Sequence, residues 1–173
     1  MKKLLPFLIV LLLSIPLFLS ACISEEDAPI DCIRLHIRAN SNDFADQSVK
    51  LAVRDDIIAL LTPKLAKASD TADALKIIAS ESGALQKTAT ARLTNEGFLY
   101  GARVRISTEY FPAKSYGDTL FPAGEYKAVI VELGNGTGDN WWCVAFPPLC
   151  FLEDGKAPVK YKSILQEILK NRN

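Results

Sequence analysis

The apolar residues of this chain change their spacing twice, and this change limits the folds that the chain can adopt. Residues 33–39 alternate between apolar and basic side chains, which predicts a half-buried strand with one face in water. A similar alternation returns after Gly97, in three segments that are separated by turn-forming residues: 102–111, 126–133 and 141–146. These segments predict the strands of one largely antiparallel sheet.

Between the first predicted strand and Gly97, the apolar residues follow helical spacing. Residues 40–43 offer helix N-caps, and we expect the helix that follows them to kink or restart at Pro63. Two more helices are predicted over residues 71–78 and 84–93, separated by Gly83. The order of elements predicts an α+β fold in a single domain: a mainly antiparallel sheet of about four strands, packed by about three helices, plus a C-terminal amphipathic helix.

The N-terminal segment is typical of an export signal. Lys2 and Lys3 precede an apolar run over residues 4–19, which as a helix is roughly 24 Å long and too short for the ~30 Å core of a membrane. Residues 19–22 resemble the lipoprotein box of bacteria, in which the cysteine is lipidated. An ordinary secretory signal that ends beside a cysteine is the alternative. We expect a lipoprotein-type signal peptide over residues 1–21 and a lipid anchor on Cys22, and therefore an exported protein that is attached to a membrane.

Charge and composition divide the rest of the chain. Residues 22–32 hold acidic side chains and no base, which predicts a solvated tether. Residues 33–153 should form the folded domain, and residues 154–173 a C-terminal tail with a short helix. The whole chain has 20 basic and 20 acidic residues, and a protein that binds nucleic acid needs a local excess of basic groups, so we expect no nucleic-acid partner.

The cysteines suggest a disulfide without fixing its pairing. Cys143 and Cys150 flank Pro147 and Pro148, which favour a turn that would bring the two cysteines within bridging range. In an oxidising compartment we expect them to pair, with a contribution of about 2.5 kcal/mol to stability. Two buried thiols are the alternative, and Cys32 is a further candidate partner for either one.

Few residues suggest catalysis. His36 is the only histidine; it lies between Arg34 and Arg38 on the polar face of the first predicted strand, where we expect it to be solvated. The glycine-rich residues 134–138 lack the helix that follows a phosphate-binding loop, so they predict a hairpin loop. No spacing typical of a metal site occurs. The sequence therefore predicts no catalytic, metal-binding or cofactor-binding residues, and no cofactor.

Two groups of aromatic residues exceed what a core requires. Trp141 and Trp142 are adjacent in a predicted strand and so point to opposite faces, and one of them must meet a helix, a loop or a partner. Residues 110–118 form an aromatic loop that contains turn-forming residues. Packing within the core or a hairpin would explain both groups, and a docking surface is the alternative.

These same regions resemble the stage II sporulation protein R family. The resemblance spans about residues 33–151 and rests on three motifs: Ala39-Asn40-Ser41 with Asp46-Gln47, Lys50 and Val53-Arg54-Asp55; residues 111–118 with Leu120 and residues 122–126; and residues 138–151. The last motif is long enough to be specific. Residues 156–173 and the tether carry no motif of the family.

The resemblance implies a function that composition alone does not. Proteins of this family are made in the forespore of endospore-forming bacteria and exported into the space between forespore and mother cell. There they activate a septal membrane protease, stage II sporulation protein GA, which removes the pro-sequence of sigma factor E. The family thus implies a signalling protein that is not an enzyme, with this protease as its receptor. A lipid anchor on Cys22 departs from the family, whose members are secreted.

Two groups of residues are candidates for contact with the receptor. Asn40, Asp46 and Gln47 follow the first predicted strand, whereas a predicted polar hairpin loop carries Lys114, Tyr116 and Asp118. Trp141 and Trp142 complete the set. Asp46 and Gln47 have an alternative role in the first turn of the helix, where a carboxylate suits the helix dipole.

Two other classes of function stay open. One is a solute-binding lipoprotein of the envelope, although the mature chain is small for the usual two-lobed architecture. The other, less favoured, is a thiol-dependent enzyme that uses Cys143 and Cys150 or His36.

Overall fold

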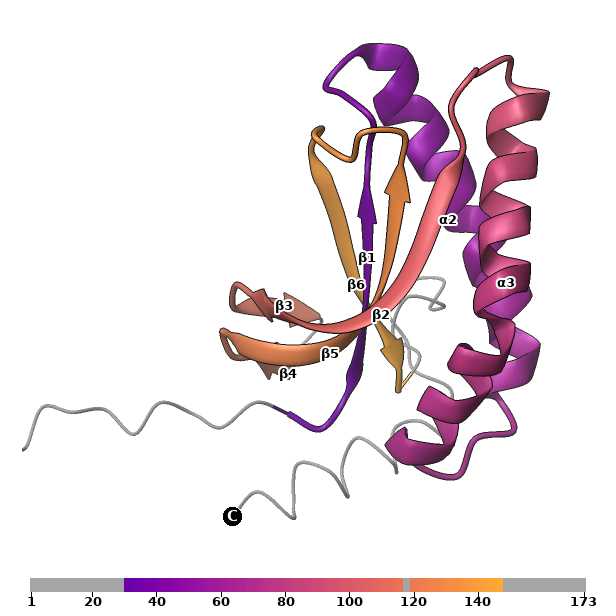
Figure 1. The fold of residues 1–173 in the computed structure, drawn as a ribbon. Helices are drawn as coiled ribbons and strands as arrows, with labels where there is room; N and C mark the ends of the chain where they lie inside the picture. Colours follow the sequence, from indigo (N-terminus) through magenta and orange to yellow (C-terminus); the bar gives the residue numbers. More distant parts are fainter. Residues whose placement is uncertain (1–29, 117–118, 148–173) are drawn as a thin grey trace, which may run out of the picture.

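In the computed structural model, which describes residues 30–116 and 119–147, the chain forms two layers: a four-stranded sheet and two helices that cover one of its faces (Figure 1). A small two-stranded hairpin lies near the end of the molecule where the described part begins. The elements in chain order are β1 (Ile33–Arg38), α2 (Phe44–Leu65), α3 (Thr71–Asn95), β2 (Ala102–Phe111), β3 (Lys114–Tyr116), β4 (Thr119–Phe121), β5 (Gly124–Leu133) and β6 (Asn140–Phe146). The predicted α+β class is confirmed.

The strands of the main sheet follow the order β2-β5-β1-β6. β1 lies parallel to β5, with Leu35 opposite Val129, and antiparallel to β6, with Leu35 opposite Cys143. β2 and β5 form a long antiparallel pair. The sheet is therefore mixed: the predicted antiparallel pairing occurs between β1 and β6 and between β2 and β5, but β1 and β5 are parallel. A parallel neighbour needs a long connection, which the residues between β1 and β5, with both helices among them, provide.

The described residues hold two long helices rather than three. α3 runs without a break through Gly83, so the prediction of two separate helices there was wrong. A Cβ at Gly83 would meet no atom within 4 Å, so this glycine only lowers helix propensity, by about 1 kcal/mol. The buried side chains of Ile78 and Leu85 on either side outweigh that loss. α2 likewise does not restart at Pro63, because a proline in the last turn removes only one hydrogen bond before the helix ends.

The helices and the sheet enclose the main core. One side of each element supplies it, at helical spacing in α2 and α3 and at every second position in the strands. Its buried members include Leu35 and Ile37 of β1, Val129 and Val131 of β5, Val53, Ile57 and Leu61 of α2, and Ile78, Leu85 and Leu93 of α3.

The basic side of β1 is not in water, as its alternation had predicted. Arg34 and His36 are only 1% and 5% exposed. The strongly curved ends of β2 and β5, together with the β3–β4 hairpin, form a second small core on this face (Figure 1). The alternation therefore identified the strand correctly but could not reveal the aromatic residues that cover its basic face.

Several predictions lie outside the described residues: the signal peptide over residues 1–21, most of the tether over residues 22–32, the end of the domain and the C-terminal tail over residues 154–173. Ile30 and Cys32 of the predicted tether are buried, so the packed part of the chain begins before β1. Within the described residues, no helix has the length and apolar character needed to cross a membrane.

Candidate functional site

The motif residues that follow β1 lie at one end of the molecule, which we call the apex. It comprises residues 39–50 before and at the start of α2, residues 96–101 between α3 and β2, and residues 134–139 between β5 and β6. Backbone hydrogen bonds join these segments, because Gly134 N donates to Gly101 O and Gly138 N donates to Ala39 O, each at 2.9 Å. The apex is therefore one hydrogen-bonded structure built from three distant parts of the sequence.

Asn40 links these parts through both its backbone and its side chain. Its backbone O accepts from Thr137 Oγ1 at 2.8 Å, and its Oδ1 accepts from Asn135 N at 3.0 Å. Its Nδ2 donates to Asp46 Oδ2 at 2.8 Å. One side chain thus fixes the β5–β6 turn against the start of α2, which explains why an asparagine suits this position.

Asp46 is the centre of the apex. Its buried carboxylate accepts hydrogen bonds from Asn40, from Ser41 Oγ at 2.6 Å and from the hydroxyl of Tyr100. Burial opposes ionisation, but the hydrogen bonds from Ser41, Tyr100 and Asn40 outweigh it and hold the pKa of Asp46 below its usual value. For Tyr100, burial and the neighbouring carboxylate raise the pKa of the phenol, so it remains a donor.

Gln47 and Lys50 close the other side of the apex. Gln47 Nε2 donates to Ser41 O at 2.8 Å, and Lys50 Nζ donates to Gln47 Oε1 at 2.6 Å and to Asp139 O at 2.8 Å. Lys50 is buried, which lowers the pKa of its amine, although the charge of Asp139 acts in the opposite direction. The structure thus brings Asn40, Asp46 and Gln47 together, and each positions a loop. Their contact with a receptor stays a prediction.

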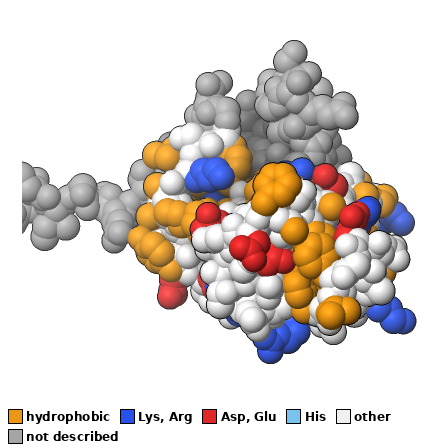
Figure 2. Space-filling view, turned by 90° about the horizontal axis from the view of Figure 1, so that it is seen from above, with side chains coloured by type: hydrophobic (Ala, Val, Ile, Leu, Met, Phe, Trp, Pro, Cys, Tyr) orange, Lys and Arg blue, Asp and Glu red, His pale blue; other side chains and the backbone are white. Residues whose placement is uncertain are grey.

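The apex also presents two large apolar side chains that the sequence analysis missed. Phe44, the first residue of α2, is 89% exposed, and Leu99 is fully exposed. Seen from above, this end of the molecule shows hydrophobic side chains beside acidic ones (Figure 2). An indication was present in the sequence: Phe44 does not lie on the apolar face of α2, and Leu99 lies beyond the apolar face of α3.

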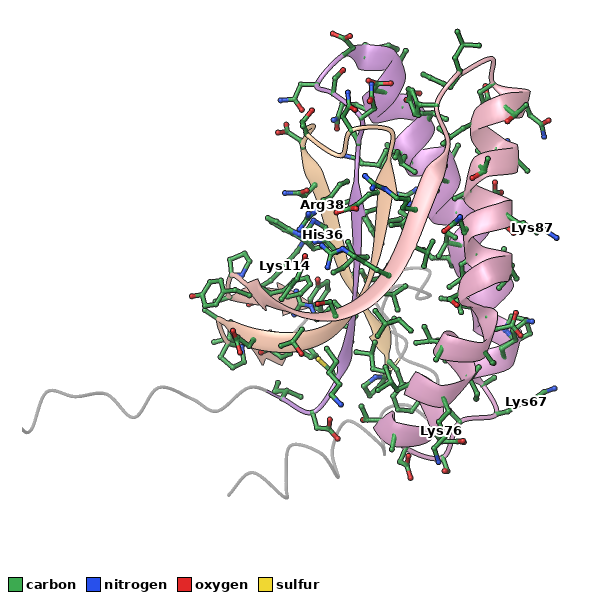
Figure 3. All side chains as sticks on the ribbon, in the orientation of Figure 1. His36, Arg38, Lys67, Lys76, Lys87 and Lys114 are labelled. Carbon is green, nitrogen blue, oxygen red and sulfur yellow. The ribbon has the colours of Figure 1, made fainter. Side chains whose placement is uncertain are left out.

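The face of the sheet opposite the helices carries an ionic network, in which the sticks of His36 and Arg38 can be followed (Figure 3). Glu109 accepts from Arg38 Nη2 at 2.7 Å and pairs with His36 Nδ1 at 2.8 Å, and Arg105 Nη2 lies 2.8 Å from the same carboxylate. Arg38 Nη1 also reaches Glu132 at 3.0 Å. Burial alone would raise the pKa of Glu109, but its bonds to His36 and Arg105 and the charge of Arg38 lower it.

The expectation of a solvated His36 was therefore wrong, because the side chain is buried beneath this network. A histidine paired with a carboxylate also occurs in catalytic sites. Here, however, two arginines share the carboxylate, and the second ring nitrogen of His36 lies 3.5 Å from Arg38 Nε. This arrangement holds three strands together and does not present His36 to a substrate.

The β3–β4 hairpin covers Arg34, whose Nε and Nη1 are buried without a hydrogen-bond partner. Its guanidinium carbon lies within 6 Å of the centres of four aromatic rings, and Phe111 at 4.7 Å and Tyr126 at 5.2 Å are the nearest; Tyr116 and Phe121 are the others. Cation–π attraction in a site without water is worth ~2 kcal/mol and partly replaces the missing hydrogen bonds. The aromatic residues of the second motif are thus the packing around one buried cation.

The remaining receptor candidates lie around the same hairpin or in β6. Lys114 is exposed, with its Nζ 5.5 Å from the ring of Tyr116, and the Tyr116 hydroxyl donates to Trp142 O at 3.3 Å. Trp141 and Trp142 point to opposite faces as predicted: Trp141 packs on the main core and under Arg54, and Trp142 on the second core. Asp118 lies outside the described residues.

The described residues include only two of the four cysteines, Cys32 and Cys143. Cys32 is a buried free thiol, and burial raises its pKa to about 12, so it is a poor nucleophile. Cys143 is buried in β6, whereas Cys22 and Cys150 lie outside the described residues. The Cys143–Cys150 pairing stays a prediction. Among residues 30–116 and 119–147, no three His, Cys, Asp or Glu side chains gather into a group that could hold a metal ion.

Comparisons with known proteins agree with the motifs. Residues 29–156 match the family Stage II sporulation protein R. The chain is also 39% identical over 125 residues to "Stage II sporulation protein R" of Bacillus subtilis (strain 168), in an alignment that covers 72% of this chain and 56% of that protein. The chain thus spans about half the length of the curated relative that it matches. No solved structure shows significant similarity.

Proposed function

The chain belongs to the stage II sporulation protein R family, and on this premise we propose that it is an extracytoplasmic signalling protein of sporulation. It activates the septal membrane protease, stage II sporulation protein GA, which processes the precursor of sigma factor E. The observation that carries this proposal is the family match over residues 29–156, which includes every described helix and strand.

The site supports an action through the surface rather than through catalysis. The polar residues of the first motif bind one another at the apex, and those of the second surround a buried arginine. The one described free thiol, Cys32, has a raised pKa, which disfavours thiolate chemistry at that position. A rigid surface of this kind suits a ligand that a membrane protein recognises.

Deletion of the gene in its host is the decisive experiment. We expect the sigma E precursor to stay uncleaved in the deletion strain, and cleavage to return with the parent gene. A Cys143→Ser/Cys150→Ser variant that is present at the parent's level should also restore cleavage, because the signal needs no thiol. Normal processing in the deletion strain would refute the proposal, and failure of the folded cysteine variant would favour the thiol-dependent enzyme.

We further propose that Cys22 carries a lipid anchor and that Cys143 and Cys150 form a disulfide. Replacing Cys22 with alanine removes the thiol that would carry the lipid. The mature protein should then move out of the detergent phase in a phase-separation assay, because without acyl chains it lacks a stable membrane attachment. Cys32→Ala, at a cysteine buried in the domain, is the matched control and should partition like the parent protein. Equal partitioning of the Cys22 variant and the parent would contradict a lipoprotein.

A further inference from the structure

The two most exposed large apolar side chains of the described residues both lie at the apex. Phe44 is 89% exposed and Leu99 fully so, compared with 68% for Tyr110, 54% for Leu120 and 41% for Leu51 elsewhere. Single exposed apolar residues are common on protein surfaces. Two of them on the same rigid structure are less common and point to a contact with a partner.

The apex holds both side chains in fixed positions. Phe44 lies between Asp43, whose backbone N donates to Ser41 Oγ at 3.1 Å, and Asp46, which accepts from the same Ser41 Oγ. Leu99 precedes Tyr100, whose hydroxyl also binds Asp46. One buried carboxylate thus anchors both loops. A surface that is already ordered loses little conformational freedom when a partner binds, so its apolar area contributes more fully to affinity.

The position of the apex indicates which partner it meets. Ile33 at the start of β1 pairs with Phe146 at the end of β6, so the residues before Ile30 and after Pro147 join the domain at the end opposite the apex. β1 runs from one of these ends to the other (Figure 1). Its six residues span roughly 20 Å. An anchor on Cys22 would therefore be linked to the domain at the end opposite the apex, which keeps the apex away from the attachment point.

The charges around Phe44 and Leu99 favour a protein over a lipid surface. Asp43, Glu96 and Asp139 are exposed at the apex, and acidic groups lie between the hydrophobic ones in the view from above (Figure 2). Acidic side chains repel a membrane surface with anionic lipids. The same charges suit a protein surface that is apolar at its centre and basic at its edge.

We propose that the apex is the surface that docks on the receptor, with Phe44 and Leu99 as its apolar anchors and an apolar, basic-rimmed patch of the membrane-embedded protease as the partner. This inference rests on the proposed function and assigns its contact site. The polar motif residues Asn40, Asp46 and Gln47 support the surface from beneath.

Serine substitutions test this assignment, in full-length variants that are expressed in the deletion strain. Phe44→Ser and Leu99→Ser remove almost no buried area, so melting temperature and protein level should match the parent. Each should lower affinity for the receptor roughly tenfold or more, and the double variant should lose cleavage of the sigma E precursor. Tyr110→Ser and Leu120→Ser are matched controls on exposed apolar residues of β2 and β4, and they should retain cleavage.

Each result decides between specific alternatives. Normal cleavage with the double apex variant, in a strain where deletion abolishes cleavage, overturns the docking site and leaves the signalling function standing. Equal loss in the control variants also overturns it. Normal cleavage in the deletion strain removes the signalling function itself. If the Cys22→Ala protein binds vesicles of phosphatidylglycerol and the same protein with the apex substitutions does not, the surface contacts lipid and the choice of a protein partner is wrong.

Discussion

Replacing Gly138 with alanine is expected to destabilise the domain by about 3 kcal/mol or more, because two backbone segments approach closely at this glycine. A Cβ at Gly138 would lie 2.5 Å from the carbonyl carbon of Ser41 and would also collide with the carbonyl oxygen of that residue. Neither group is the end of a flexible side chain, so the β1–α2 connection would have to move. That movement would break the hydrogen bond from Gly138 N to Ala39 O.

The same substitution at Gly83 is the matched control, with the opposite sign. Gly83 lies inside α3 and a Cβ there meets no atom within 4 Å, so Gly83→Ala should stabilise the protein by roughly 0.5–1 kcal/mol. Urea unfolding of both purified variants measures the difference. A Gly138→Ala protein as stable as the parent would show that the apex is not closely packed.

Replacing Asp46 with asparagine should lower stability by about 1–3 kcal/mol. Three donors, from Asn40, Ser41 and Tyr100, point at the carboxylate, and an amide offers only one acceptor oxygen to them. The amide nitrogen would take the place of the oxygen that Tyr100 binds, so the Tyr100 hydroxyl would lose its acceptor, and the other two hydrogen bonds would lose the strength that the charge gives them. Asp55→Asn, at an exposed carboxylate of α2, is the control and should change stability by less than about 0.5 kcal/mol.

Acid should abolish this difference in the free energy of unfolding between the parent and the Asp46 variant. Because the pKa of Asp46 is lowered in the folded protein, the ionised carboxylate stabilises the fold above the ordinary pKa of ~3.9. That contribution disappears as the pH falls through the lower, folded value. Unfolding curves at pH 7 and in strong acid should therefore show a gap that closes only in acid, and a gap that is constant with pH would contradict an ionised Asp46.

The strands could be predicted from the sequence because their alternation is a local property. Residues 102–111 and 141–146 lie close to the bounds of β2 and β6. The parallel pairing of β1 with β5 could not be predicted, since nothing in residues 33–39 distinguishes a parallel neighbour from an antiparallel one. The continuity of α3 was missed because Gly83 was read as a break, although a helix with buried residues on both sides tolerates one glycine.

The motifs located the apex but not its mode of action. Asn40, Asp46 and Gln47 were identified as a group, yet their mutual hydrogen bonds depend on Tyr100 and on residues 134–139, which the chain brings near only when it is folded. Arg34 and His36 were placed in water because basic residues on a strand are usually solvated. The packing of the β3–β4 hairpin against that face is a tertiary property without a local signal.

The central position of β1 in the sheet affects the order in which the elements of the domain can fold. Both neighbours of β1, the strands β5 and β6, come from the far end of the described chain, so the strand must wait unpaired while about a hundred residues follow it out of the ribosome or an export channel. The α2–α3 pair depends on contacts that are close in sequence and can form earlier. A chain that is cut short before β6 would keep its helices but leave one backbone edge of Ile33–Arg38 unpaired. Such fragments should aggregate rather than act as partial signals.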